Sequence, residues 1–379
     1  MNQLSLGVMA RSLKENERRL PLHPDHFGRI PDDLRGSVYL ERGYGDGFGV
    51  SDDQLKSRVA GLRTREQLVA ECDVILQPKP LLRDIAEMRV GQALWGWPHC
   101  VQDKELTQLA IEQELTLIAF EAMNHWNSDG SFNLHVFHKN NELAGYCSVL
   151  HAMKIAGSTG AYGRRLRAVV IGFGATARGA VTALNALDVY DVDVLTHRAV
   201  AAVASPIHSA RIVHFHDDDH GQVSHAVTED GCVPLPEFLA DHDIIVNCVL
   251  QNTDAPLMFM TDGDLAKLTS DTLIVDVSCD DGMGFSWARP TTFAEPTFVV
   301  GDNVLYYAVD HSPSYLWNSA TWENSEAILP FLPTVMGGGD AWDADPTIRR
   351  AIEIREGVIQ KPAILSFQNR AAEYPHRRT

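Results

Sequence analysis

The sequence predicts an α/β protein whose domains are built on mostly parallel β-sheets. Short apolar segments typical of strands alternate along the chain with helical segments, the order of a parallel sheet with helical crossovers. The runs 243–250 and 271–279 are apolar almost throughout and bounded by polar residues, as expected of strands buried on both faces. A glycine-rich turn at 171–177 follows another apolar strand and opens a helix.

Length and composition bound the class of protein. The 379 residues suggest two domains, with three as the alternative. No apolar run approaches the roughly 18–20 residues that span a bilayer, and the N-terminus lacks the pattern of a signal peptide. The six cysteines form no CxxC pair, so we expect reduced thiols in a cytoplasmic protein.

The net charge is −18, from 32 basic and 50 acidic residues. A negative field repels phosphate backbones, so the charge argues against general nucleic-acid binding. It leaves open an anionic small ligand held by a local group of Arg and Lys.

The first part of the chain contains four predicted strands, at 3–10, 71–78, 92–97 and 115–123, with helices at 65–72 and 103–114 between them. A long apolar helix begins near Asn140, with Asn140 or Asn141 as its N-cap. A second strand–turn–helix series then starts, with a strand at 167–171, a helix at 175–187 and a strand at 191–198.

The turn Ile171-Gly-Phe-Gly-Ala-Thr-Ala177 matches the G-x-G-x-x-G/A fingerprint of dinucleotide-binding proteins. Gly172 permits the tight turn, Gly174 lets the backbone approach a pyrophosphate, and the small Ala177 lets helix and strand pack closely. The motif alone is weak, and a structural glycine turn is the alternative. Its position between a strand and a helix is the context that a dinucleotide site requires.

The end of the next strand indicates which dinucleotide. An NAD site usually has an acid about 20 residues on, to bind the ribose 2′-OH. This chain has Thr196, His197 and Arg198 instead. Thr196 can donate a hydrogen bond and Arg198 can pair with a 2′-phosphate, so NADPH is favoured over NADH; the alternative is that Arg198 points into solvent.

Several motifs, in this order, resemble the alanine dehydrogenase/transhydrogenase superfamily: KENERRLPLHP (14–24), LQPKP (76–80), GWPHC (96–100), HKNNELAG (138–145), DIIVNCVL, IVDVSCD and VDHSPSYL (309–316). Within it the chain is most similar to the opine-type branch, which includes N5-(carboxyethyl)ornithine synthase and, more distantly, lysine-forming saccharopine dehydrogenase. The resemblance covers roughly residues 1–330.

The resemblance implies two Rossmann-like domains, the nucleotide-binding domain being inserted into a discontinuous substrate domain. The expected boundaries are 1–139 and 312–379 for the substrate domain and 140–311 for the nucleotide-binding domain. The active site is then expected in the cleft between the two.

The resemblance also assigns the residues of the substrate domain. Arg19 matches the arginine that holds the oxo-acid carboxylate, a task suited to its planar fork. Lys79, between Pro78 and Pro80, matches the lysine of acid–base chemistry. Some relatives carry an acid directly after this lysine, which Pro80 replaces here. His99 matches the family histidine, a natural proton shuttle near neutral pH.

Further candidates are less specific. Glu121 matches an acid of saccharopine dehydrogenases and is a candidate for the amine of a second substrate, a plain surface position being equally compatible. Lys139 is a candidate for a second carboxylate. Asp280 and Asp310 are candidates for the nicotinamide side of the cleft, Asp310 also for substrate binding, and Leu250 for backbone contacts to the cofactor.

We expect no metal site. The segment HFHDDDH (214–220) has metal-ligand residue types but lacks a spacing that places them on one face, and solvated loops often have this composition.

The expected reaction is the NADPH-dependent condensation of a 2-oxo acid, pyruvate or a relative, with the amine of an amino acid to give a secondary amine. Two alternatives remain: amination with free ammonia, as in an alanine dehydrogenase, and a non-catalytic pyridine-nucleotide sensor. The partners are thus small molecules, with neither nucleic acid nor membrane, and a homo-oligomer is left open.

Overall fold

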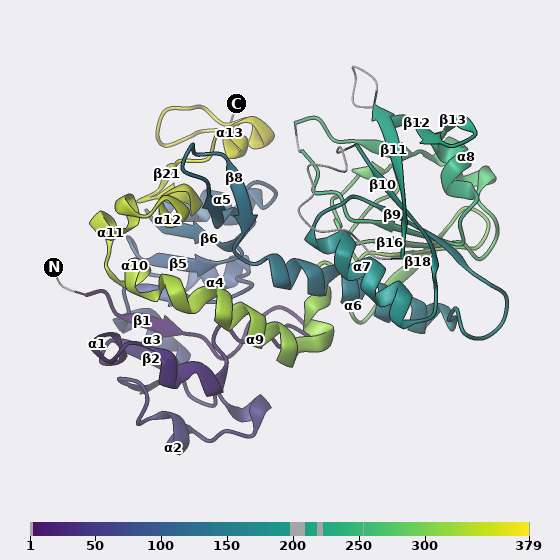
Figure 1. Cartoon of the computed structure of the whole chain (residues 1–379). Helices are drawn as coiled ribbons and strands as arrows, with labels where there is room; N and C mark the ends of the chain where they lie inside the picture. Colours follow the sequence, from purple (N-terminus) through teal and green to yellow (C-terminus); the bar gives the residue numbers. More distant parts are fainter. Residues whose placement is uncertain (1–2, 198–208, 218–222, 253, 379) are drawn as a thin grey trace. The chain divides into compact units, whose positions relative to one another are not determined.

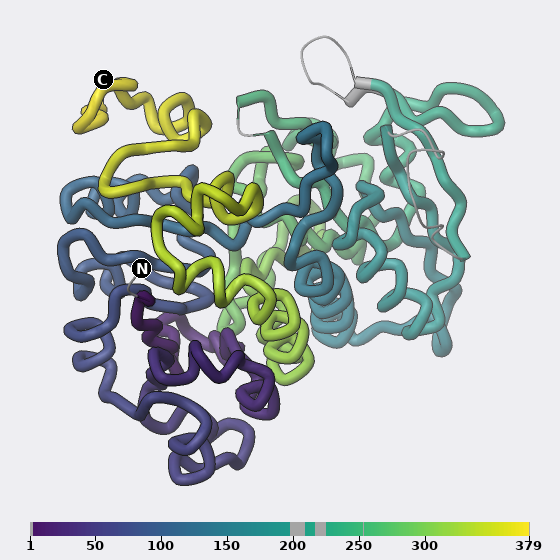
Figure 2. The backbone as a smooth tube through the Cα atoms, turned by 60° about the vertical axis from the view of Figure 1, so that its left-hand side comes forward, coloured from purple at the N-terminus to yellow at the C-terminus, as the bar shows by residue number. Residues whose placement is uncertain are grey.

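The computed structural model describes residues 3–197, 209–217, 223–252 and 254–378. The chain divides into two compact units, one of residues 1–137 with 317–379 and one of residues 138–316. The second unit is therefore an insertion in the first. Figures 1 and 2 show the C-terminal segment, in yellow, returning to the elements of the N-terminal part, in purple and blue.

The first unit contains an eight-stranded sheet in the order β21-β20-β6-β5-β4-β1-β2-β3. Six strands are parallel, and β20 and β21 are added antiparallel at one edge. The strands are β1 (Leu6–Val8), β2 (Val38–Glu41), β3 (Gly61–Arg63), β4 (Val74–Leu76), β5 (Ala93–Gly96), β6 (Thr116–Ala119), β20 (Ile352–Arg355) and β21 (Val358–Ile359).

The order 3-2-1-4-5-6 of the parallel strands is that of the doubly wound fold. Helices and short 3₁₀ turns connect the strands, and a small hairpin of β7 (Asn124–Trp126) and β8 (Phe132–His135) follows β6. The helical elements are η1 (Pro24–Arg29), α1 (Asp32–Arg35), η2 (Asp46–Phe48), α2 (Asp52–Leu55), α3 (Arg65–Glu71), α4 (Leu82–Ala86), α5 (Lys104–Glu112), η3 (Phe120–Ala122), α9 (Trp317–Ile328), η7 (Leu329–Phe331), α10 (Leu332–Met336), α11 (Gly339–Ala344), α12 (Pro346–Ala351) and α13 (Pro362–Gln368).

The second unit repeats this winding. Its nine-stranded sheet has the order β13-β12-β11-β10-β9-β14-β16-β19-β18, with the six central strands parallel. The elements are α6 (His138–Ala156), β9 (Arg167–Ile171), α7 (Ala175–Ala186), β10 (Asp191–Thr196), β11 (Arg211–Asp217), β12 (Val223–Thr228), β13 (Gly231–Pro234), α8 (Leu235–Ala240), β14 (Ile244–Asn247), β15 (Met258–Met260), η5 (Asp262–Lys267), β16 (Leu273–Asp276), β17 (Gly284–Phe285), β18 (Thr297–Val300), β19 (Val304–Tyr307) and η6 (Ser312–Leu316). The predicted α/β class with two Rossmann-like domains is confirmed.

Alternation along the strands builds two cores in each unit. In β9, Val170 faces one apolar layer and Val169 the opposite one, and Val246 and Ile245 of β14 divide in the same way. Burial on both faces explains why these strands are apolar almost throughout in the sequence.

Side-chain hydrogen bonds cap the N-termini of two predicted helices. Thr64 and Gln67 form a capping box at the start of α3, and the Asp103 side chain accepts a hydrogen bond from the Leu106 N–H at the start of α5.

Two predicted boundaries are wrong. The strand predicted at 115–123 ends at Ala119, because the chain turns there into the 3₁₀ helix η3. Helix α6 begins at His138, so Asn140 and Asn141 lie in its first turn and neither caps it.

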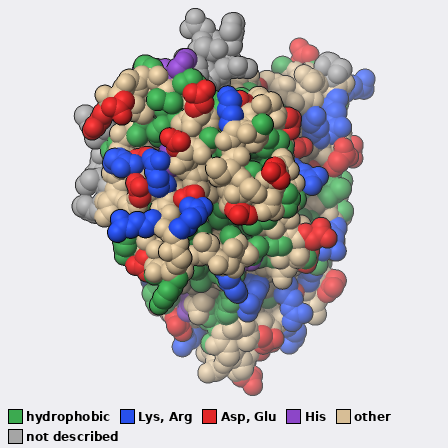
Figure 3. Space-filling model, turned by 90° about the vertical axis from the view of Figure 1, so that its right-hand side faces the viewer, with side chains coloured by type: hydrophobic (Ala, Val, Ile, Leu, Met, Phe, Trp, Pro, Cys, Tyr) green, Lys and Arg blue, Asp and Glu red, His purple; other side chains and the backbone are tan. Residues whose placement is uncertain are grey.

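Of the described residues, no helix combines the length and the apolar character needed to cross a bilayer. On the face seen in Figure 3, acidic and basic side chains are interspersed.

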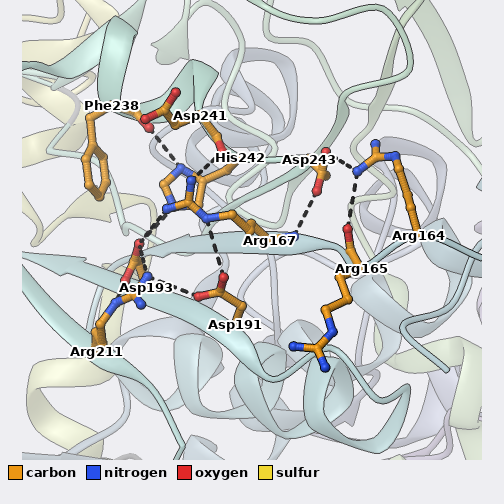
Figure 4. A network of polar contacts seen from close by, with 10 residues as sticks. All are labelled: Arg164, Arg165, Arg167, Asp191, Asp193, Arg211, Phe238, Asp241, His242 and Asp243. Carbon is orange, nitrogen blue, oxygen red and sulfur yellow. Dashed lines mark hydrogen bonds and ion pairs between the residues drawn. The ribbon is translucent and has the colours of Figure 1, made fainter.

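A charged network lies at the amino ends of β9 and β10 in the second unit (Figure 4). Asp193 and His242 are 3% and 2% exposed, and the His242 Nε2 lies 2.9 Å from the Asp193 carboxylate. The His242 Nδ1 lies 2.8 Å from the Phe238 carbonyl, and Arg211 donates to Asp193 from the other side. Burial alone would raise the pKa of Asp193, but the hydrogen bonds from His242 and Arg211 outweigh it and lower this pKa to about 2.

We predict that Asp193→Asn destabilises the protein in a pH-dependent way. An acid with a lowered pKa stabilises the fold above its unfolded pKa of about 3.9, and this contribution disappears as the pH falls toward about 2. The loss should be about 2–3 kcal/mol at pH 6, or several degrees in Tm, and should shrink below pH 4. Calorimetry between pH 2.5 and 7 measures it.

Asp191→Asn is the matched control, because Asp191 pairs with the same arginine and is half-exposed. It should change Tm far less. A gap between parent and Asp193→Asn that stayed constant down to pH 2.5 would contradict the assigned role of this carboxylate.

Candidate active site

Lys79 and His99 meet at the carboxyl ends of neighbouring parallel strands. Lys79 follows β4 and His99 follows β5, and these strands are paired in register from Val74 with Ala93 onward. The Lys79 Nζ lies 2.8 Å from the His99 Nε2. Carboxyl ends of strands in doubly wound sheets are where ligands bind, so both predicted acid–base residues stand at a suitable edge.

Main-chain contacts fix this pair. The Trp97 N–H donates to the Pro78 carbonyl at 2.8 Å, and the Ser12 hydroxyl donates to the Lys79 carbonyl at 2.8 Å. A Cβ on Gly96 would lie 2.0 Å from the Gln77 carbonyl oxygen, so only glycine lets β5 pass so close to the lysine loop.

His99 has a left-handed backbone, with φ of +50°, which is uncommon for a residue other than glycine. Glu121 holds it in place, because its Oε1 accepts the His99 backbone N–H at 2.7 Å. The same oxygen lies 3.7 Å from the His99 Nδ1. Lys79, His99 and Glu121 thus form a line across the ends of β4, β5 and β6.

Glu121 lies next to a charged group that the sequence analysis missed. Glu353 of β20 is 1% exposed and pairs with Lys361, and Cys100 beside His99 is fully buried. Burial, followed by the negative charge of Glu353, raises the pKa of Glu121 well above its usual range. The Oε2 atoms of Glu121 and Glu353 are buried without a hydrogen-bond partner among the described residues. The sequence offered one sign of this buried acid, namely that Glu353 lies within the strand segment IEIR.

Arg19 is buried beside the same edge of the sheet. Its side chain lies over the Trp97 ring at 5.1 Å and forms a two-fold hydrogen bond with Glu17, the Nε–Oε1 distance being 2.9 Å. The Leu20 N–H donates to the Thr321 hydroxyl of α9, which fixes the backbone beside it. The partnership with Glu17 was not predicted, although both residues lie in the motif KENERR.

In the second unit, the glycine-rich turn has the geometry of a phosphate cradle. Gly172 has φ of +116°, and a Cβ there would lie 3.1 Å from the Cys248 carbonyl oxygen. A Cβ on Gly174 would meet nothing within 4 Å, while Ala177 in the first turn of α7 is fully buried. The turn lies between β9 and β14, where the strand order reverses, so these residues fit a dinucleotide pyrophosphate.

Buried polar groups stand at the same end of this sheet. Asp276, the last residue of β16, accepts hydrogen bonds from Tyr306 and from the Asn247 amide, the latter at 3.0 Å. Burial raises the pKa of Asp276 to about 6 despite these bonds, and burial also raises the pKa of Asp280 to about 6. Asp276 was missed, although an acid inside an apolar strand was the signal.

The remaining predicted residues of this unit differ in exposure and in their partners. Thr196 ends β10 and is 3% exposed, whereas Leu250, after β14, is 94% exposed. The Asp310 carboxylate lies 2.7 Å from the His311 Nδ1. Lys139, half-exposed on α6, pairs with Glu142 at 2.8 Å.

Two predictions fall partly or wholly outside the described residues. Arg198 lies outside the described residues, and the segment 214–220 is described only up to 217. Among the described residues, no group of three or more His, Cys, Asp or Glu side chains is placed to hold a metal ion.

The comparisons with known proteins agree with this architecture. The model of the alanine dehydrogenase/PNT N-terminal domain matches residues 7–144, and that of the C-terminal domain matches residues 144–362. Together the two models account for most of an α/β chain made of two doubly wound units. The chain belongs to the alanine dehydrogenase/PNT family.

Individual relatives are distant. An alanine dehydrogenase of Mycobacterium tuberculosis is 24% identical over 363 residues, which cover 91% of this chain and 92% of the relative. An N(5)-(carboxyethyl)ornithine synthase of Clostridium botulinum is 23% identical over 323 residues, covering 82% and 89%.

Solved structures show the same fold. An L-alanine dehydrogenase matches with a TM-score of 0.73 at 19% identity, covering 96% of this chain and 99% of its own. A transhydrogenase from Sinorhizobium meliloti matches with a TM-score of 0.68 at 18% identity, covering 94% and 99%.

We predict that Glu121→Gln stabilises the protein more at high pH than at low pH. The raised pKa keeps the folded carboxyl neutral where the unfolded one, with a pKa of about 4.3, is ionised. Stability therefore falls as the pH rises above about 4.3, until the folded group ionises too. Glutamine removes this loss, so the Tm gap between variant and parent should widen from pH 5 to pH 8.

Thermal unfolding across that range is the measurement, with Glu373→Gln, an exposed glutamate, as the control whose gap stays flat. A Glu121→Gln gap independent of pH would mean that Glu121 is ionised in the folded protein throughout.

Proposed function

We propose that the protein is a nicotinamide-dependent oxidoreductase that joins a 2-oxo acid to the amine of an amino acid. The observation that carries the proposal is the contact of Lys79 with His99, backed by Glu121, at the carboxyl edge of the first sheet. Membership of the alanine dehydrogenase/PNT family and the likeness to alanine dehydrogenases and to an N(5)-(carboxyethyl)ornithine synthase support the reaction class.

Each residue of the first unit has a proposed task. Arg19 holds the oxo-acid carboxylate, and Glu17 keeps the guanidinium in a fixed orientation through its two-fold hydrogen bond. The amine adds to the carbonyl carbon, and loss of water then gives an imine.

The short contact between Lys79 Nζ and His99 Nε2 is suited to passing one proton. Lys79 exchanges a proton with the reacting oxygen and nitrogen, and His99 receives or returns it. Glu121 fixes the His99 main chain and thereby the direction of the ring.

The second unit is proposed to hold the cofactor. Gly172, Gly174 and the first turn of α7 would bind the pyrophosphate, and Thr196 the ribose. When bound, NADPH supplies the hydride that reduces the imine carbon to a secondary amine. Asp280, Asp310 and the main chain at Leu250 remain candidates for the nicotinamide end, Asp310 also for substrate and Lys139 for a second carboxylate.

Two other functions remain as alternatives. Amination with free ammonia needs the same residues and is supported by the alanine dehydrogenases among the relatives. A nucleotide sensor on the same fold has no need of a lysine and a histidine in contact at a strand edge. NADPH oxidation with mass detection, for pyruvate, glyoxylate and 2-oxoglutarate against ornithine, lysine, arginine and ammonia, distinguishes all three. No turnover with any pair would contradict the proposal.

We predict that Lys79→Met and His99→Gln lower kcat by roughly 10²–10⁴-fold, the usual size of an acid–base contribution. Both residues lie outside the glycine-rich unit, so NADPH affinity should stay near that of the parent. Steady-state kinetics and cofactor titration measure the two effects.

Lys56→Met and His125→Gln serve as controls for the same changes at exposed positions of the same unit. Parental turnover in both active-site variants at saturating substrate would exclude the proposed proton transfer.

We predict that NADPH is preferred over NADH, since β10 ends at Thr196 rather than at an acid. Arg198→Ala should raise the KM for NADPH roughly 10–150-fold, the size of a charge-assisted contact, with little change for NADH. Equal use of both cofactors by the parent would contradict this prediction.

A further inference from the structure

Glu353 lies at an irregularity of β20, the strand of the C-terminal return that pairs with β6. Ile352 and Ile354, two residues apart, lie opposite consecutive residues of β6. They also pack in different apolar cores of the unit, although residues two apart in a regular strand share a face. A bulge of this kind re-aims a side chain and is frequent beside active sites. Here it turns inward a glutamate that is only 1% exposed.

Lys361 provides the counter-charge of Glu353. Its Nζ forms an ion pair with the Glu353 Oε1, and its backbone N–H donates to the Glu353 carbonyl, as does that of Gln360. Burial alone would lower the pKa of Lys361, but the charge and the hydrogen bond of Glu353 outweigh burial and raise this pKa. The pair therefore consists of an ammonium and a carboxylate, with the carboxylate on the buried side.

Titratable groups from three parts of the first unit interact with Glu121. They are His99 and Cys100 after β5, Glu353 on β20 and Lys361 after β21. The Cys100 thiol is itself hydrogen-bonded to Glu353. Burial, followed by the charge of Glu353, raises the pKa of Glu121 to about 8, against the smaller opposing effect of Lys361. At neutral pH the Glu121 carboxyl therefore carries a proton.

The proton on Glu121 decides which charge lies next to His99. The Glu121 Oε1 accepts the His99 backbone N–H at 2.7 Å and lies 3.7 Å from the ring Nδ1. An ionised carboxylate at that distance would favour the imidazolium, as opposite charges within about 4–6 Å do. A neutral carboxyl exerts no such attraction. It leaves the ring with its hydrogen on Nδ1 and with Nε2, 2.8 Å from the Lys79 Nζ, as an acceptor.

We propose that Glu353 is a positioning residue of the candidate site, which keeps the proton on Glu121. The neutral Glu121 in turn leaves the His99 ring uncharged, so that its Nε2 accepts a proton from Lys79. In that step an N–H bond at the Lys79 Nζ breaks and a new one forms at the His99 Nε2. The inference rests on the proposed function and deepens it, because it gives the C-terminal return a part in proton transfer.

The test replaces Glu353 by glutamine and follows the titration of His99 by NMR of protein with isotope-labelled histidine. The spectrum of His99→Gln assigns the signal. Without the charge of Glu353, Lys361 acts on Glu121 alone, and Glu121 ionises and stabilises the imidazolium. The pKa of His99 should therefore rise by about 1. Glu353→Asp, which keeps the charge, should restore most of the parental titration.

A double-variant cycle separates this effect from a loss of structure. In the Glu121→Gln background, Glu353→Gln should leave the His99 titration unchanged, because no carboxylate remains there to ionise. Glu356→Gln, which removes an exposed acid next to β20, is the matched control and should titrate as the parent does.

Infrared spectroscopy of the parent needs no change at Glu353 and therefore decides the matter if Glu353→Gln does not fold. At neutral pH the parent should show a protonated-carboxyl band that is missing from Glu121→Gln. For any substrate pair that supports NADPH oxidation, the acid limb of the kcat/KM profile of Glu353→Gln should move to higher pH. The accompanying loss should reach up to about 10-fold on the acid side.

The inference is overturned if the parent lacks the carboxyl band of Glu121. It is also overturned if Glu353→Gln leaves the His99 titration unchanged, or moves it equally with and without Glu121. The proposed function fails separately if the His99 titration moves as expected but no substrate pair is turned over.

Discussion

The hydrogen bond between Lys79 and His99 is the contact on which the candidate site depends. It requires the neighbouring strands β4 and β5 to end within reach of each other and a histidine held in a left-handed conformation. Gly96 allows the close passage of β5, and Glu121 holds the His99 main chain. The doubly wound sheet provides the frame, since its parallel strands bring their carboxyl ends to one edge.

Burial and the charge of Glu353 raise the pKa of Glu121, the acid that accepts the His99 main-chain N–H. The negative charge of Glu353 acts on Glu121, and two ionised carboxylates close to each other and largely shielded from water would repel. Lys361 neutralises Glu353, which leaves Glu121 as the group that keeps its proton more readily. The C-terminal return of the chain, through β20, thus contributes charge beside the candidate site as well as an edge to the sheet.

The sequence predicts the fold well because its signals are local and repeated. Apolar runs such as 243–250 identify buried parallel strands, and the turn at Gly172 identifies the start of the second doubly wound unit. Lys79 and His99 were predicted from motifs, and the structure brings them together. The partners Glu17, Glu353 and Asp276 were missed because a buried acid in one sequence looks like any other acid until tertiary contacts enclose it.

Arg18 and Arg19 are adjacent in the sequence but have different surroundings in the structure. In the motif Arg18 is the unremarked neighbour of Arg19, and the alternation of an extended segment sends the two side chains in different directions. Arg19 enters the core against Trp97, while the exposed Arg18 lies over the Trp317 ring. Trp317 is the first residue of the C-terminal return, which follows the inserted unit in the chain. The two adjacent arginines therefore lie in different surroundings, Arg19 in the core and Arg18 at the surface.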